Sequence, residues 1–145
     1  MLTTLLAAAA LALAPSPAAP ALPNLTVVGI THTYYVYPDN TCSVVLRVRV
    51  RNSGAATSNG FVVGAKGWGT ASISSCTGTW RAINTTASLG ASQERTITVY
   101  GPGYVGPRIL RGSALTVTAR ADTHCAIVES SESDNALTRT IHVGS

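Results

Sequence analysis

The stretch Val44–Arg51, VVLRVRVR, decides the fold class. Successive side chains of a strand point to opposite faces, so its apolar residues share one face and its arginines share the other. The inward set is Leu46, Val48 and Val50, and the outward set is Arg47, Arg49 and Arg51. Alternation of this kind is typical of an antiparallel strand with one face in a core and the other in water.

Short apolar segments with the same character recur along the chain at intervals of about ten residues, with turn signals between them. Beyond residue 21, Val and Ile total 21 residues and Leu only 7, a balance that favours pleated strands over helices. Gly101–Gly112, with four glycines and two prolines, predicts a loop. The expected strands are Leu25–Thr33, Val44–Arg51, Phe61–Lys66, one or two within Ala71–Leu89, Arg95–Tyr100, Leu115–Ala121 and Ala136–Val143. About seven such strands predict an all-β antiparallel sandwich.

The N-terminal stretch has the features of an export signal. Leu5–Ala14 is uncharged and apolar, too short for a membrane span of about twenty residues. Ala19-Pro20-Ala21 fits the small-x-small pattern of a cleavage site, although the alternative is a frayed apolar terminus. We therefore expect a signal peptide at 1–21, one domain at 22–145, no membrane span, and a secreted, periplasmic or cell-surface location.

The charge pattern argues against nucleic acid as a partner. The chain has ten basic and six acidic residues among 145, for a net charge of +4. Nine of the ten basic residues are arginines, and they are scattered rather than gathered in a run. Four of the six acids fall in one short segment: Asp122, Glu129, Glu132 and Asp134. This predicts a mostly basic surface with one acidic end.

Catalytic signatures are weak. The spacing of the three cysteines fits no zinc site, and Gly-x-Ser-x-Gly is absent. His124 and Cys125 are adjacent, which points their side chains apart in an extended strand, so a nucleophilic Cys–His pair would have to be assembled by the fold. We expect no enzyme activity and no cofactor.

Three groups are candidate binding residues. The row Arg47, Arg49 and Arg51 could bind an acidic glycan or a protein, or form a solvated face that resists edge aggregation. The acids Asp122, Glu129, Glu132 and Asp134 carry suitable oxygens for Ca²⁺, but the favoured interpretation is that they accept backbone N–H bonds and fix a turn. Tyr104, between Gly103 and Gly106, is the tyrosine best placed for an exposed contact.

Four segments resemble the CARDB family, the cell-adhesion-related domain found in bacteria. Pro23–Ile30 resembles its P-D-L-x-V opening, and Val44–Gly54 its V-x-V-x-N-x-G strand and turn. Ser88–Ser92 is similar to the L-x-x-G-x-S turn, and Ala121–Asn135 resembles the closing D-x-x-x-x-V-x-E-x-x-E-x-N-N. The resemblance implies an immunoglobulin-like sandwich of seven strands, secreted or at the cell surface, that serves as a binding or spacer module without catalytic residues.

The order of strands that the resemblance implies predicts at which end of the sandwich each cysteine lies. With it, Cys42 and Cys76 lie at one end of the sandwich and Cys125 at the other, which favours a Cys42–Cys76 disulfide. If Cys76 instead sits at the far end of the fourth strand, Cys76–Cys125 becomes possible.

These observations predict a secreted, non-enzymatic binding or adhesion-type module that engages an extracellular protein or glycan. The alternative is a secreted inhibitor or an accessory subunit of an extracellular enzyme.

Overall fold

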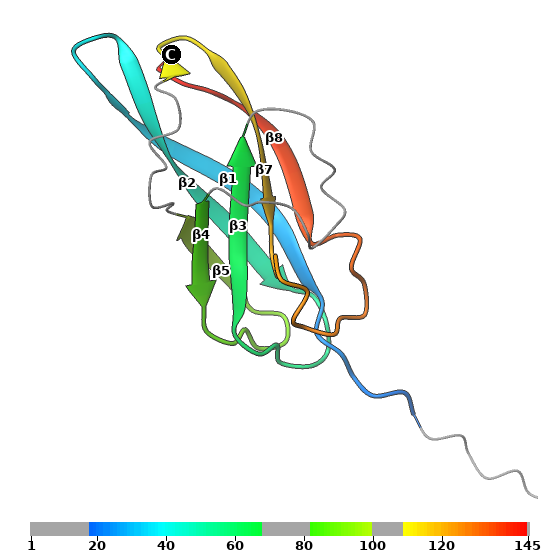
Figure 1. The fold of residues 1–145 in the computed structure, drawn as a ribbon. Coiled ribbons are helices and arrows are strands. Elements are labelled where there is room, and N and C mark those ends of the chain that lie inside the picture. Colours follow the sequence, from blue (N-terminus) through cyan, green and yellow to red (C-terminus); the bar gives the residue numbers. More distant parts are fainter. Residues whose placement is uncertain (1–17, 68–81, 100–108, 145) are drawn as a thin grey trace, which may run out of the picture.

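The computed structural model describes residues 18–67, 82–99 and 109–144, and these form an all-β sandwich (Figure 1). All strand pairs are antiparallel. One sheet has the order β1-β2-β5, with β6 also paired to β2, and the other has the order β4-β3-β7-β8. The strands are β1 (Leu25–Val36), β2 (Thr41–Asn52), β3 (Phe61–Gly67), β4 (Ala82–Thr86), β5 (Glu94–Val99), β6 (Ile109–Leu110), β7 (Ala114–Arg120) and β8 (Ala136–His142).

The alternation read from β2 holds in three dimensions. Leu46, Val48 and Val50 are at most 1% exposed, whereas the arginines between them face solvent. The same inward rows recur on the opposite sheet, so the two sheets close over one apolar core. Besides the β2 residues, its fully buried members include Leu25, Ile30, Val63, Leu89, Val99, Val117 and Val143. The prediction of an all-β antiparallel sandwich is confirmed.

One strand lies where a loop was predicted. β6 pairs Ile109 and Leu110 with Cys42 and Thr41, at the end of β2 nearest the first hairpin. β5 pairs with β2 only from Leu46 onward. The residues of β2 that precede Leu46 therefore have an unpaired edge, and the short strand β6 pairs with it. A strand of two residues is too short to show a periodic sequence pattern, and it forms here only because this part of β2 extends beyond β5.

At each side of the sandwich, where the edge strands of the two sheets meet, side chains form hydrogen bonds to the backbone of the opposite sheet. On one side, the edge strands β4 and β5 are linked by Asn84, whose amide donates to the carbonyl oxygen of Thr98 at 2.7 Å. On the other side, the edge strands β1 and β8 run beside each other (Figure 1). Here Arg139 and His32 make the links, and a groove remains between the strands.

Candidate functional site

The outer face of the β1-β2-β5 sheet carries the predicted arginine row. Arg47, Arg49 and Arg51 are all exposed, as the alternation requires. Arg49 Nε lies 3.0 Å from a carboxylate oxygen of Glu94 on β5, and both side chains are about half exposed. Such an exposed pair adds little stability, about 0–1 kcal/mol, but it holds the guanidinium over the sheet. The neighbours of the row on this face are mainly threonines, including Thr31 and Thr96.

A groove of about 280 Å³ opens beside this row, at the edge of β1. The pairing of β1 with β2 shifts register between Val27 and Gly29, which marks a bulge in the edge strand. The guanidinium of Arg49 lies against Gly29, where an added Cβ would sit 3.6 Å from Nε. The polar side chains that line the groove are Thr31, Arg47, Arg49, Thr96 and Arg139.

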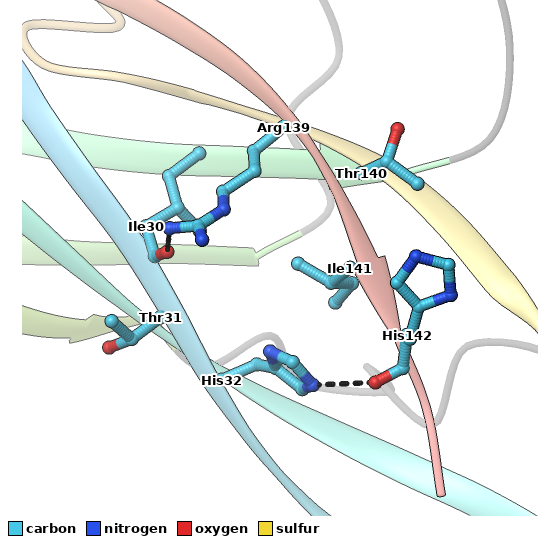
Figure 2. Close-up of a pocket in the computed structure, with 7 residues that line it drawn as sticks. All are labelled: Ile30, Thr31, His32, Arg139, Thr140, Ile141 and His142. Atoms are coloured by element: carbon cyan, nitrogen blue, oxygen red, sulfur yellow. Dashed lines mark hydrogen bonds between the residues drawn. The ribbon is translucent and has the colours of Figure 1, made fainter. Parts of the chain in front are cut away.

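Arg139 joins this groove from the opposite sheet. On β8 it occupies the inward row between Leu137 and Ile141, yet its side chain is exposed. Figure 2 shows it reaching across to β1, where Nη1 donates to the carbonyl oxygen of Ile30 at 3.0 Å. Sequence analysis missed this residue. The signal for it was a charged side chain within an otherwise apolar alternating row.

A second hollow, of about 340 Å³, shares Ile30, Thr31 and Arg139 with the first. In it, Nε2 of His32 lies 2.9 Å from the carbonyl oxygen of His142, while the ring of His142 points away (Figure 2). A carbonyl oxygen only accepts, so Nε2 of His32 carries the hydrogen. Arg139 and His32 therefore satisfy backbone carbonyls along both sheet edges.

The end of the β1-β2 hairpin projects from the sandwich and exposes apolar side chains (Figure 1). Tyr35 is 64% exposed, Leu110 of the paired β6 is 63% exposed, and Tyr34 and Val36 are partly exposed. The rings of Tyr35 and Tyr37 meet edge to face, with centroids 5.0 Å apart. Tyr35 and Leu110 share the outward face with Ser43 and Thr41, and Tyr34 and Val36 lie on the other face. We call Tyr34, Tyr35, Val36 and Leu110, which surround this end of the sheet, the hairpin patch. The predicted contact residue Tyr104 lies outside the described residues.

The acidic segment forms the connection between β7 and β8, at the end of the sandwich where β1 begins. Asp122 accepts the backbone N–H groups of Ala126 and Ile127, at 3.1 and 2.8 Å. Glu129 accepts the N–H of Leu25 and the amide of Asn135. These carboxylates shape the connection, as the hydrogen-bonding interpretation predicts.

The other two acids of the connection are also engaged. Glu132 lies 3.6 Å from the guanidinium of the buried Arg120. Burial opposes ionisation of Asp134, but donors from Asn24 and Thr26 outweigh it, and the pKa of Asp134 is lowered. Among the described residues, no group of three or more His, Cys, Asp or Glu side chains is arranged to hold a metal ion.

The match to a family decides the identity. The CARDB family model covers residues 22–139. The chain belongs to the CARDB family. No curated protein matches it.

Two solved structures have the same fold. The crystal structure of the CARDB domain of a Pyrococcus furiosus protein, in complex with di-metal ions, is 22% identical. The match covers 84% of this chain and 89% of that one, with a TM-score of 0.56. A domain of a putative cell surface protein from Methanosarcina acetivorans is also 22% identical, covering 84% of this chain and 92% of that one with a TM-score of 0.60. CARDB is a non-catalytic, adhesion-type domain family.

Asn52, in the strand-and-turn motif of this CARDB domain, has a structural role. Its side chain is fully buried, and its Oδ1 accepts the N–H groups of Asn24 and Gly54 at 3.0 Å each. Its Nδ2 donates to the carbonyl oxygens of Ala56 and Leu89, at 2.8 and 2.9 Å. One side chain thus ties the start of β1 to the turn after β2 and to the turn before β5.

The predicted Cys42–Cys76 disulfide is wrong. Cys42 is a buried free cysteine, whereas Cys125 is disulfide-bonded. Cys42 lies on β2 near the first hairpin and Cys125 in the β7-β8 connection, so they occupy opposite ends of the sandwich. Cys76 lies outside the described residues. Disulfide bonding of Cys125 also removes the thiol from the hypothetical His124–Cys125 pair.

Replacing Glu129 by Gln should remove part of the pH dependence of stability. Burial raises the pKa of Glu129 from 4.5 to about 7, against the opposing effect of its bonds to Leu25 and Asn135. The folded state therefore binds this proton more tightly than the unfolded chain does. Proton binding to Glu129 therefore stabilises the folded state. This stabilisation is fully present below the pKa that Glu129 has in the unfolded chain, and it is lost as the pH rises through about 7.

We expect the native chain to lose about 1–2 kcal/mol of unfolding free energy through this group between about pH 5 and pH 8, after allowance for solvent screening. Urea denaturation across that range, with the native chain and Glu129→Gln compared, measures the difference. Glu94→Gln, a change at an exposed acid, is the control and should follow the native curve. Parallel curves for the native chain and Glu129→Gln would contradict the assignment.

Proposed function

We propose that this CARDB domain is an extracellular, non-catalytic binding module of the adhesion type, which contacts a partner protein through the hairpin patch. The observation that carries the proposal is that exposed apolar side chains lie on both faces of this projecting end: Tyr35 and Leu110 on one face, Tyr34 and Val36 on the other. Exposed apolar clusters with aromatic members are typical of protein-binding surfaces. The patch lies at the opposite end from the hydrogen-bonded β7-β8 connection, where the side chains are committed to the fold.

An extracellular location is supported by the leader-like segment 1–21 and by the family. Residues 18–21 are exposed, and Leu22 is where backbone contacts with the sandwich begin, through its carbonyl oxygen to the N–H of Ala55. A cut before Leu22 would leave these contacts intact. Among the described residues there is no helix long and apolar enough to cross a membrane.

Metal binding by the Pyrococcus domain is not extended to this chain. The oxygens of Asp122, Glu129 and Asp134 accept protein donors, and Glu132 faces Arg120. A cation at these four carboxylates would compete with the bonds that they accept from the protein.

The test compares partner capture by three versions of the full chain. The double variant Tyr35→Ser/Leu110→Ser should retain at least about tenfold less cell-envelope and secreted protein than the native chain, the effect of losing two contact residues. Val128→Ser is the matched control, because Val128 is 74% exposed at the other end of the sandwich. It should capture partners as the native chain does.

Equal capture by the double variant and the native chain would contradict the role of the hairpin patch. Retention of one extracellular enzyme in a fixed ratio would favour the alternative of an inhibitor or accessory subunit. No captured partner at all would contradict the binding function.

A further inference from the structure

We propose that the groove beside β1 is a binding site for the acidic groups of a polysaccharide, with Arg47, Arg49 and Arg139 as its anion-binding residues. None of these residues belongs to the hairpin patch, so the site is additional to the partner contact proposed above. The groove has a volume of about 280 Å³, enough for a charged sugar substituent and ordered water.

The groove exists because polar residues stand in the inward rows of both edge strands. Ile30 on β1 is 1% exposed, but the next inward position is His32. On β8, Arg139 separates Leu137 from the buried Ile141. The polar side chains at these positions do not pack in the core and instead form hydrogen bonds to backbone carbonyl oxygens at the edge of the sandwich. The sandwich is therefore open and polar between β1 and β8 rather than sealed by apolar packing.

Donors remain available in the groove after the internal bonds are counted. A guanidinium has five N–H donors, and Arg139 uses Nη1 for the carbonyl oxygen of Ile30. Arg49 directs Nε to Glu94, which leaves its terminal nitrogens. Arg47 lines the groove without an ion pair in the described part of the chain. Three guanidiniums that converge from two sheets suit sulfate or carboxylate oxygens, which they bind through charge-assisted hydrogen bonds.

The charge around the groove favours an anion. Of the six acids in the chain, four lie in the β7-β8 connection and one, Asp39, lies at the hairpin turn. Glu94, the remaining acid, pairs with Arg49 and offsets one of the three arginine charges. No acidic side chain lines the groove itself.

The chemistry of the lining favours a polysaccharide over a protein. The centre of a protein interface normally holds aromatic or large apolar anchors. The exposed large apolar side chains of the described residues are Tyr34, Tyr35, Val36, Leu110 and Val128, and none of them lines this groove. Threonine hydroxyls at Thr31 and Thr96 instead flank the arginines, and they match the hydroxyl groups of a sugar.

The test measures binding of the full chain to dextran sulfate, polygalacturonate and uncharged dextran. The first two present sulfate and carboxylate, and the ratio of their affinities shows which acidic group the site prefers. We expect binding to at least one acidic polymer and none to dextran. Arg47→Ala and Arg139→Gln should each weaken that binding about tenfold or more, the effect of losing one charge-assisted contact. Gln at 139 keeps a donor for the carbonyl oxygen of Ile30, and thermal unfolding checks that the fold is retained.

Arg51→Ala is the matched control, since Arg51 lies on the same strand and face but does not line the groove. It removes the same charge and should weaken binding less than about threefold, the effect of general electrostatics alone. A second variant, Gly29→Leu, places an uncharged side chain over the groove, where the three atoms nearest to an added Cβ belong to Arg49 and lie at ordinary contact distance. It should also abolish binding without a change in net charge.

Equal weakening by Arg47→Ala and Arg51→Ala would overturn the proposal, because binding would then follow net charge and not the groove. Binding of poly-glutamate as tight as that of the acidic polysaccharides, lost in the same variants, would also overturn it in favour of an acidic protein. Double variant Tyr35→Ser/Leu110→Ser should bind the acidic polymer normally, so failure of the hairpin patch and failure of the groove are distinguishable.

Discussion

Asn52→Ala should lower the free energy of unfolding by about 3–5 kcal/mol. The side chain makes four hydrogen bonds to backbone groups and is completely buried. Alanine would leave the N–H groups of Asn24 and Gly54 and the carbonyl oxygens of Ala56 and Leu89 without these partners. A buried polar group that loses its bond costs about 1–3 kcal/mol, and water can replace the partner only at the more exposed of these positions.

Urea denaturation of Asn52→Ala beside Asn59→Ala measures the effect. Asn59 is exposed, lies in the connection that follows β2, and forms no hydrogen bond in the described structure. Its replacement should change stability by about 0.5 kcal/mol or less. A loss below about 1 kcal/mol for Asn52→Ala would contradict the central role of this amide.

Asn52→Asp separates the accepting and donating halves of the same amide. It keeps an oxygen for the N–H groups of Asn24 and Gly54 but replaces both donors with a carboxylate next to two carbonyl oxygens. The variant should be strongly destabilised at neutral pH and should regain part of its stability in acid. The reason is that a protonated carboxyl can donate to the carbonyl oxygen of Leu89. Equal losses at both pH values would mean that the donors contribute little.

The strands could be predicted because each one alternates between apolar and polar positions on a half-buried sheet. In β2, the inward and outward sets read from VVLRVRVR are the buried and exposed sets of the structure. That signal is local and needs no knowledge of the partner strand. The extension of β1 to Val36 and the two-residue β6 were missed, because both depend on how far β2 overhangs β5.

The groove could be predicted only in part. The alternation placed Arg47 and Arg49 on one exposed face, but Arg139 comes from a strand about ninety residues away on the other sheet. Its approach to Ile30 follows from the pairing of sheet edges, which no local pattern encodes. The predicted Cys42–Cys76 disulfide failed for a similar reason, because the pairing of cysteines depends on long-range contacts that no local pattern encodes.

Gly54→Ala should destabilise the domain by about 2–4 kcal/mol through steric overlap alone. A Cβ on residue 54 would lie 2.5 Å from the backbone N of Asn24, the carbonyl oxygen of Leu22 and the carbonyl carbon of Pro23. These are backbone atoms that cannot rotate away. The chain before β1 would have to move, and the bond from the N–H of Ser53 to the carbonyl oxygen of Asn24, 2.8 Å long, would break with it.

Gly112 supplies the contrasting case. It has φ +86° and nothing within 4 Å of its added Cβ, so Gly112→Ala meets only backbone strain, about 1–2 kcal/mol. Asn tolerates that conformation better than Ala, so Gly112→Asn should recover part of the loss, whereas Gly54→Asn should be at least as damaging as Gly54→Ala. Thermal unfolding ranks the four variants, and amide exchange at Asn24 and Leu25 reports whether the start of β1 has come free. Partial rescue by Asn at position 54 would show that backbone conformation, and not contact with residues 22–24, requires glycine there.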